Sequence, residues 1–173
     1  MILLEIITIV IILQRLSELV VSKRNIAWAL QRGGVEHGAD HYWMFITLHT
    51  AWIVSFNVEW LLLRPSMPPF WPVLLASFIA AQVLRYWAIS TLGKRWNTRI
   101  IVLNNEPLIA RGPYRWLRHP NYLAVIVEIF VVPAMLGDWI TASLFTIANA
   151  ALLLLVRIPA ENAALRRGTG GGT

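Results

Sequence analysis

The sequence predicts an all-α, polytopic integral membrane protein with about five transmembrane helices. Three observations carry this prediction: an apolar composition, five long apolar runs, and basic residues that lie mostly between those runs. Hydrophobic residues make up 57% of the 173 residues and charged residues 14%, whereas soluble domains have about 45–50% apolar and about 25% charged residues. The length suits one domain, expected over residues 1–167, with a flexible Gly-rich tail at 168–173.

Each apolar run is about as long as a transmembrane helix, which needs about 20 residues with a range of about 17–25. The first run has neither a basic flank nor a small-residue cleavage site, so we expect a retained span and not a signal peptide. Only Gly137 and Asp138 separate the last two runs, which predicts a tight helical hairpin. The five runs lie at about 1–21, 42–63, 71–90, 120–136 and 139–158.

Basic residues predict the orientation, because cytoplasmic loops carry an excess of Lys and Arg. The loops after the second and fourth runs hold only Arg64 between them. We therefore expect the N-terminus outside and the C-terminus in the cytosol, with the cofactor pocket at the cytosolic face. We expect the membrane to be a bacterial inner membrane. Twelve of the fifteen basic residues follow the first, third and fifth runs: Lys23, Arg24, Arg32, Lys94, Arg95, Arg99, Arg111, Arg115, Arg118, Arg157, Arg166 and Arg167.

Composition also excludes several classes of function. The net charge of +6 could indicate a nucleic-acid partner, but the positive residues lie between apolar runs and not along one solvated face, so we expect none. The chain has no cysteine, which excludes disulfides, thiolate metal sites and a cysteine nucleophile. It has no dinucleotide-binding, P-loop or G-x-S-x-G motif.

The loop RGPYRWLRHPNY at 111–122 leads directly into the fourth apolar run. Pro120 suits the first turn of a helix, where its missing N–H costs nothing. It also moves His119 out of helical geometry. We therefore expect a helix that begins at Pro120 with its free N–H groups facing the cytosol, where they attract anions.

The side chains of this loop suit a polar ligand that carries a carboxylate and an aromatic ring. Arg115 and Arg118 can form paired hydrogen bonds to a carboxylate, and Tyr114, Trp116 and Tyr122 offer flat aromatic surfaces. A juxtamembrane basic belt that binds lipid phosphates explains the arginines equally well. The residues alone leave both interpretations open.

A second motif, RIPAENAAL at 157–165, follows the fifth run. Arg157 and Glu161 are four residues apart and share a face if the segment is helical. Pro159 would occupy the first turn of a helix if the span breaks there. The Glu161 carboxylate could bind an ammonium or a ribose hydroxyl, whereas the alternative is a surface ion pair between Arg157 and Glu161.

Several polar residues lie within the spans, where ionisable groups are costly and are usually paired or functional. We expect Arg15 to pair with Glu18, and Arg85 to extend to the cytosolic interface. Glu128 could form a buried hydrogen bond to another helix or could contact the substrate. His49 could be a core histidine or could contact the substrate. His37 and His41 have a spacing that can bind metal on a helix, but we expect no metal site.

The two motifs together resemble the isoprenylcysteine carboxyl methyltransferase family, integral membrane enzymes that use S-adenosylmethionine. The family pattern has Gly–x–Tyr, then Arg–His–Pro–x–Tyr–x–Gly, then Arg–x–x–x–Glu–Glu. Here Ala124 stands for the last glycine of the second element and Asn162 for the second glutamate. The segments QRLSELVVSKRN, GGVEHGADHYWMFITLH and LGKRWNTRIIVL resemble a bacterial branch associated with O-methylation of long-chain alkylpyrones or alkylresorcinols.

This resemblance implies an S-adenosylmethionine-dependent methyltransferase that acts on a lipophilic small molecule among membrane lipids. The acceptor would be a long-chain alkylpyrone, a phenolic lipid or a prenylcysteine-like carboxylate. The implied catalytic residues are Arg157 and Glu161, and on the acceptor side we place Arg157, His49 and Glu128. The expected cofactor-binding residues are Leu108, Ile109, Gly112, Tyr114, Arg118, His119, Pro120, Asn121, Tyr122, Glu161 and Asn162.

Three alternatives remain at this point. A membrane sterol or lipid reductase that uses NADPH carries an RHPNY-like element, but generally follows it with Gly and an acidic residue, whereas Leu123, Ala124 and Val125 follow here. A phospholipid N-methyltransferase is a related possibility. A non-enzymatic membrane protein would explain the arginines but not both motifs.

Overall fold

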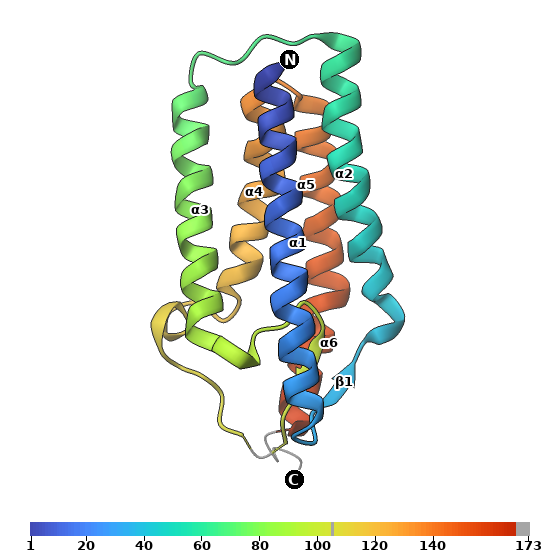
Figure 1. Cartoon of the computed structure of the whole chain (residues 1–173), viewed down its shortest axis with the longest axis vertical. Helices are drawn as coiled ribbons and strands as arrows, with labels where there is room; N and C mark the ends of the chain where they lie inside the picture. The colour runs from blue at the N-terminus through green and yellow to red at the C-terminus, as the bar shows by residue number, and fades with distance from the viewer. Residues whose placement is uncertain (105, 169–173) are drawn as a thin grey trace.

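The computed structural model describes residues 1–104 and 106–168 and forms a bundle of long helices with short elements gathered at one end (Figure 1). The connection from α2 to α3 and the turn from α4 to α5 lie at the other end, near the N-terminus. Of the expected tail, residues 169–173 lie outside the described residues. The long helices are α1 (Ile2–Leu30), α2 (Tyr42–Leu63), α3 (Trp71–Leu92), α4 (Pro120–Leu136), α5 (Trp139–Leu152) and α6 (Ile158–Gly168).

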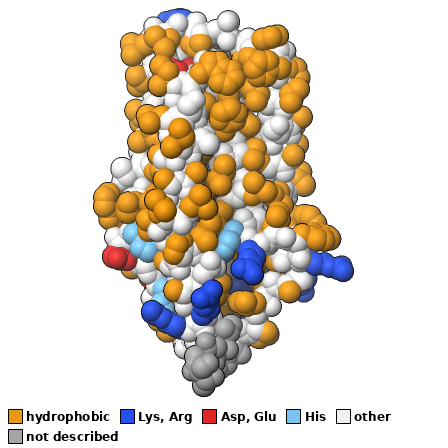
Figure 2. All heavy atoms as spheres, turned by 180° about the vertical axis from the view of Figure 1, so that it is seen from behind, with side chains coloured by type: hydrophobic (Ala, Val, Ile, Leu, Met, Phe, Trp, Pro, Cys, Tyr) orange, Lys and Arg blue, Asp and Glu red, His pale blue; other side chains and the backbone are white. Residues whose placement is uncertain are grey.

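The prediction of a mostly helical membrane protein is confirmed. Three helical stretches among the described residues are long and apolar enough to cross a membrane: Ala39–Leu63, Trp71–Arg95 and Trp139–Gly168. The 17-residue α4 is a shorter apolar helix. Figure 2 shows apolar side chains over the visible face of the bundle, with most visible Lys and Arg near the end that holds the short elements. The count of five spans and their orientation stay predictions.

The expected hairpin between α4 and α5 is present. Gly137 ends α4 with φ 89°, and a Cβ there would lie 2.6 Å from the carbonyl oxygen of Ser66, so a glycine is required on both counts. Glu59 of α2 receives hydrogen bonds from the backbone N–H groups of Ile140 (3.1 Å) and Thr141 (2.7 Å). A carboxylate thereby satisfies the free N–H groups that begin α5.

Pro133 inside α4 is accommodated by a side chain from α2. Proline has no N–H, so the carbonyl of Ile129 one turn earlier loses its helical partner. The indole Nε1 of Trp52 donates to this carbonyl at 3.0 Å, and both residues are buried. They belong to the main core cluster of the bundle: Leu4, Ile11, Trp52, Phe56, Val125, Ile129, Val132 and Leu136.

Four charged side chains form a buried ion cluster within the bundle: Arg15, Glu18, Arg85 and Glu128. Arg15 lies 3.0 Å from both carboxylates, and Arg85 binds Glu18 at 3.0 Å and also Glu128. The expected pairing of Arg15 with Glu18 is confirmed. The expectation for Arg85 is wrong, because its side chain is 1% exposed and does not reach the interface. Two opposite charges compensate it inside the bundle.

The structure adds one element that the sequence did not predict, a small two-stranded sheet. Strand β1 (Val35–His37) pairs antiparallel with β2 (Ile100–Val102), with Val35 opposite Val102. Each strand has only three residues, too few for a recognisable alternation of apolar and polar residues. Ala164 of α6 packs against the buried side chains of β2. The sheet thereby joins the end of α1 to the C-terminal helix.

The remaining short elements shape the same end of the molecule. Between α5 and α6 the chain forms one π-helical turn over Leu153–Arg157. Pro159 lies in the first turn of α6, and its ring would crowd the carbonyl of Leu155 in a regular α-helix. Three 3₁₀ turns complete the fold: η1 (Ala39–His41), η2 (Gly93–Arg95) and η3 (Gly112–Arg115).

Candidate functional site

A cavity of about 520 Å³ lies at this end of the bundle, where the start of α4 meets α6 and the segment between α3 and α4. We call it the functional cavity. It brings together the two sequence motifs, RGPYRWLRHPNY and RIPAENAAL, which are about 40 residues apart in the chain. Nine of the eleven expected cofactor-binding residues line it: Leu108, Ile109, Tyr114, Arg118, His119, Asn121, Tyr122, Glu161 and Asn162.

The two other expected cofactor-binding residues do not line the cavity. They determine the path of the backbone beside it. Pro120 is buried and begins α4, as the sequence predicts. Gly112 has φ 56°, and a Cβ there would lie 2.4 Å from Oγ1 of Thr91 and 3.2 Å from the indole nitrogen of Trp87. Gly112 therefore permits the loop to pass close against α3.

The hydroxyl of Tyr122 connects the two expected catalytic residues. Nε of Arg157 donates to this hydroxyl at 2.9 Å, and the hydroxyl donates to Oε2 of Glu161. Arg157 and Glu161 form no direct salt bridge in the described structure, although their spacing of four permits one. The interpretation of Arg157 and Glu161 as a surface ion pair is therefore wrong, because Tyr122 lies between them and Arg157 is only 6% exposed.

His119 and Asn121 present unpaired polar atoms to the functional cavity. The His119 ring stacks on Tyr122 with centroids 5.2 Å apart, and its Nδ1 lies 3.8 Å from Oε1 of Glu161. Its Nε2, Oδ1 of Asn121 and Oδ1 of Asn97 are buried without a hydrogen-bond partner among the described residues. Buried polar atoms are normally paired, so these three atoms are available to a ligand.

Tyr114 supplies a neutral hydroxyl at the same cavity. Burial raises the pKa of this phenol above its usual value, and the nearby Glu161 carboxylate raises the pKa further. The hydroxyl therefore stays protonated and can donate a hydrogen bond at physiological pH.

Sequence reasoning missed the residues that hold Arg157 in place. A terminal nitrogen of Arg157 donates to the carbonyl oxygen of Thr98 at 2.9 Å. The Thr98 hydroxyl in turn hydrogen-bonds Ser22 of α1 (2.8 Å) and Tyr42 of α2 (3.1 Å), and the guanidinium lies over the ring of Phe45. A single hydroxyl outside a motif has no recognisable sequence pattern. The contribution of these residues to holding Arg157 in place is therefore visible only in the folded structure.

Two residues expected on the acceptor side do not line the functional cavity. His49 lies within α2, and its Nδ1 hydrogen-bonds the carbonyl oxygen of Phe45 at 2.8 Å. Glu128 is fully buried in the ion cluster, which matches the interpretation as a buried bond to other helices. No group of three or more metal-binding side chains occurs in the part of the chain that the structure describes.

Residues 73–167, which contain most of the cavity lining, match the sequence profile of the Isoprenylcysteine carboxyl methyltransferase (ICMT) family. The chain belongs to the ICMT family. It is also similar to protein YpbQ of Bacillus subtilis (strain 168), an uncharacterized protein, with 39% identity over 157 residues that cover 91% of this chain and 93% of that protein. ICMT proteins are a family of membrane methyltransferases, so membership makes this chain a membrane enzyme.

The functional cavity fits the cofactor that ICMT membership implies, S-adenosylmethionine. That molecule carries an ammonium, a carboxylate, ribose hydroxyls and an adenine ring. The cavity offers a carboxylate at Glu161, a cation at Arg118, unpaired polar atoms at His119 and Asn121, and apolar walls that include Leu108. Each chemical group of the cofactor therefore has a complementary partner among the lining residues.

Proposed function

We propose that this ICMT-family protein is an S-adenosylmethionine-dependent methyltransferase that methylates an oxygen of a lipophilic acceptor at the membrane surface. The functional cavity carries this proposal, because a polar, partly unsatisfied site lies directly at the end of an apolar helical bundle. When bound, the cofactor supplies an activated methyl group. A polar cofactor and a membrane-dissolved acceptor can meet only where the bilayer ends.

The cofactor's groups can be assigned to lining residues by charge and polarity. Glu161 would accept hydrogen bonds from the ammonium or a ribose hydroxyl, and Arg118 would bind the carboxylate. His119 Nε2 and Asn121 Oδ1 would pair with further polar groups. Leu108 and Ile109 would contact the adenine. Asn162, also in the lining, replaces a family glutamate and keeps hydrogen bonding without a second negative charge.

Arg157 favours an anionic acceptor. Its guanidinium is almost completely buried and is held by Tyr122 and the Thr98 carbonyl, so it would attract an oxyanion and repel an ammonium. This supports O-methylation over the phospholipid N-methylation alternative. An acidic enol, phenol or carboxylic acid would arrive partly or wholly ionised, so a strong general base is unnecessary, and a nearby carboxylate could help to deprotonate a weaker acid. Positioning of the two reactants can contribute about 7–11 kcal/mol toward the barrier.

The acceptor we propose is a long-chain alkylpyrone, a phenolic lipid or a prenylcysteine-like carboxylate. Each combines an acidic oxygen for Arg157 with a hydrocarbon chain that can remain in the bilayer. The NADPH-dependent reductase is disfavoured, because the chain belongs to a family of methyltransferases.

Two experiments test this function. Purified protein is incubated with methyl-labelled S-adenosylmethionine and fractionated host lipids, and labelled products are identified by mass spectrometry. Calorimetry in detergent compares S-adenosylhomocysteine with NADPH. We expect a methylated lipid and saturable binding of S-adenosylhomocysteine. Saturable NADPH binding without a response to S-adenosylhomocysteine would overturn the proposal.

A further inference from the structure

One face of α1 carries buried polar side chains at the end of the bundle that holds the functional cavity. Ser22 is 1% exposed and Asn25 is 9% exposed, and their spacing of three places them on one face of the helix. Closer to the N-terminus, Leu4 and Ile11 bury apolar side chains on α1. A helix that only had to pack would bury apolar side chains throughout. The partners of Ser22 and Asn25 therefore indicate what this polar face does.

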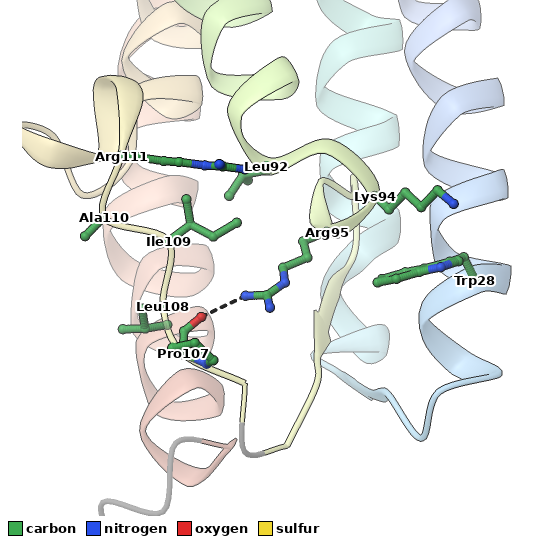
Figure 3. Close-up of a pocket in the computed structure, with 9 residues that line it drawn as sticks. All are labelled: Trp28, Leu92, Lys94, Arg95, Pro107, Leu108, Ile109, Ala110 and Arg111. Carbon is green, nitrogen blue, oxygen red and sulfur yellow. Dashed lines mark hydrogen bonds between the residues drawn. The ribbon is translucent and has the colours of Figure 1, made fainter.

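Asn25 holds the chain where it leaves α3. Its side-chain amide donates to the carbonyl oxygens of Gly93 at 3.1 Å and of Trp96 at 2.7 Å, and the Trp96 side chain is buried. One turn further along α1, the Trp28 ring centre lies 5.9 Å from the Lys94 ammonium (Figure 3). The segment that follows α3 therefore lies against α1.

Ser22 fixes the orientation of Thr98 in the same segment. The backbone N–H of Thr98 donates to Oγ of Ser22 at 2.9 Å, and the two side-chain hydroxyls lie 2.8 Å apart. The Thr98 hydroxyl also lies 3.1 Å from the hydroxyl of Tyr42. Thr98 lies between η2 and β2, so neither a helix nor a strand pairing holds its backbone. Its orientation therefore depends on side chains from α1 and α2.

The carbonyl of Thr98 is one of two groups that orient Arg157. It accepts a hydrogen bond from a terminal nitrogen of Arg157 at 2.9 Å, whereas Nε of Arg157 donates to the hydroxyl of Tyr122 at 2.9 Å. An arginine side chain has many rotamers, and two acceptors on different nitrogens fix the plane of its guanidinium. A displacement of the Thr98 carbonyl would therefore turn the group that we assign to the acceptor.

We infer that Ser22, supported by Asn25, is a positioning residue for methyl transfer. Neither residue lines the functional cavity, and both act on Arg157 through the Thr98 carbonyl. This makes α1 part of the acceptor side of the site, although it lies outside the residues that match the family profile. The inference rests on the proposed function, because that function assigns Arg157 to the acceptor.

Ser22→Ala tests this inference, because it removes the acceptor of the Thr98 N–H and one partner of the Thr98 hydroxyl. Turnover is measured with saturating methyl-labelled S-adenosylmethionine and the fractionated host lipids. The affinity for S-adenosylhomocysteine is measured by calorimetry in detergent. The matched control is Ser17→Ala in the same helix, because Ser17 is exposed and donates only to the carbonyl of Gln14 within α1.

We expect Ser22→Ala to lower turnover about tenfold to a hundredfold, since a misplacement of about 1 Å can cost about a hundredfold. The affinity for S-adenosylhomocysteine should stay nearly unchanged, because Arg157 does not bind the cofactor in the proposed assignment. Loss of turnover without loss of cofactor affinity separates positioning from a general disturbance of the fold. Ser17→Ala should match the wild type in both measurements.

Two variants of Thr98 test the same connection from its other side. Thr98→Val removes the hydroxyl and keeps the shape, so it should lower turnover as Ser22→Ala does, whereas Thr98→Ser keeps the hydroxyl and should retain most turnover. Wild-type turnover in Ser22→Ala, or a loss of S-adenosylhomocysteine affinity as large as the loss of turnover, would overturn the inference. A wild type that transfers no methyl group would instead overturn the proposed function on which the inference rests.

Discussion

A single hydroxyl, on Tyr122, holds two side chains of opposite charge at the functional cavity. It accepts a hydrogen bond from Arg157 and donates one to Glu161. Hydrogen bonds to charged groups contribute about 1.5–3 kcal/mol each. The orientation of both charges therefore depends on one oxygen atom.

Tyr122→Phe removes this oxygen and preserves the ring that stacks on His119. We expect kcat to fall about tenfold to a hundredfold, because both charged side chains lose a fixed partner. The unfolding temperature should also fall, because two hydrogen bonds to charged groups are lost. Steady-state kinetics and thermal unfolding measure the two effects. Tyr86→Phe, at an exposed tyrosine of α3, is the control and should leave both unchanged. An unaltered kcat in Tyr122→Phe would show that the link has no role in turnover.

Glu161 and Arg157 should differ in what their loss affects. Removing one partner of a buried charge pair typically costs about 2–5 kcal/mol, so Glu161→Gln should weaken S-adenosylhomocysteine binding at least about tenfold. Arg157→Gln should leave this affinity nearly unchanged and abolish turnover, because Arg157 is assigned to the acceptor. Calorimetry and a double-mutant cycle measure the coupling. Equal losses in both single variants, with no further loss in the double variant, would contradict the division of roles.

At the scale of elements, the turn between α4 and α5 contains an unusual carboxyl group. Asp138 is fully buried, and neither oxygen of its side chain has a partner among the described residues. Burial raises its pKa to about 7, and the nearby Glu59 carboxylate adds to the shift. Asp138 therefore stays protonated in the folded protein over a range where it ionises in the unfolded chain.

This shift predicts how stability depends on pH. The contribution of Asp138 is complete below its unfolded pKa of about 4, is lost as the pH rises to about 7, and is constant above that. Asp138→Asn should remove this loss of stability, so the variant should gain about 4 kcal/mol over the wild type between pH 4 and pH 8. Thermal unfolding in detergent across this range measures the difference. A difference that does not change with pH would contradict the prediction.

The ion cluster joins α1, α3 and α4, and it should tolerate loss of a pair better than loss of one charge. Glu128→Ala leaves Arg15 and Arg85 facing only Glu18, which should cost about 3–5 kcal/mol. Replacing Arg85 and Glu128 together by Met leaves Arg15 paired with Glu18 and should cost clearly less. Thermal unfolding of the wild type, of Glu128→Ala and of the double variant compares their stabilities. A double variant as unstable as Glu128→Ala would show that charge balance is not the cause.

At the scale of the whole molecule, the distribution of basic residues predicts the orientation in the membrane. The connection from α2 to α3, which contains Ser66, lies at the end of the bundle opposite the short elements, whereas Asn104 follows strand β2 at the end that holds them. The chain has no native cysteine. We expect an impermeant maleimide to label Ser66→Cys in intact cells and Asn104→Cys only after permeabilisation, because basic residues are retained on the cytosolic side. The reverse pattern would invert the orientation.

Much of the helical architecture follows from the sequence. Long apolar runs must be helical in a membrane, since every backbone polar group there needs an internal partner. A two-residue gap at Gly137 and Asp138 leaves room only for a hairpin. The short strands Val35–His37 and Ile100–Val102 could not be predicted in the same way, because their pairing joins segments about 65 residues apart and neither strand has a pattern of its own.

Part of the lining of the functional cavity was predicted from two motifs and from the family resemblance, but the partners of these residues were not. Proline and arginine spacing locates the start of α4 and the carboxylate of α6, because those signals are local. Tertiary structure alone places Tyr122 between Arg157 and Glu161, positions Thr98 behind Arg157 and buries Arg85 against Glu128. The physical reason is that hydrogen bonds and ion pairs depend on distances of a few ångströms, which only the packing of distant segments determines.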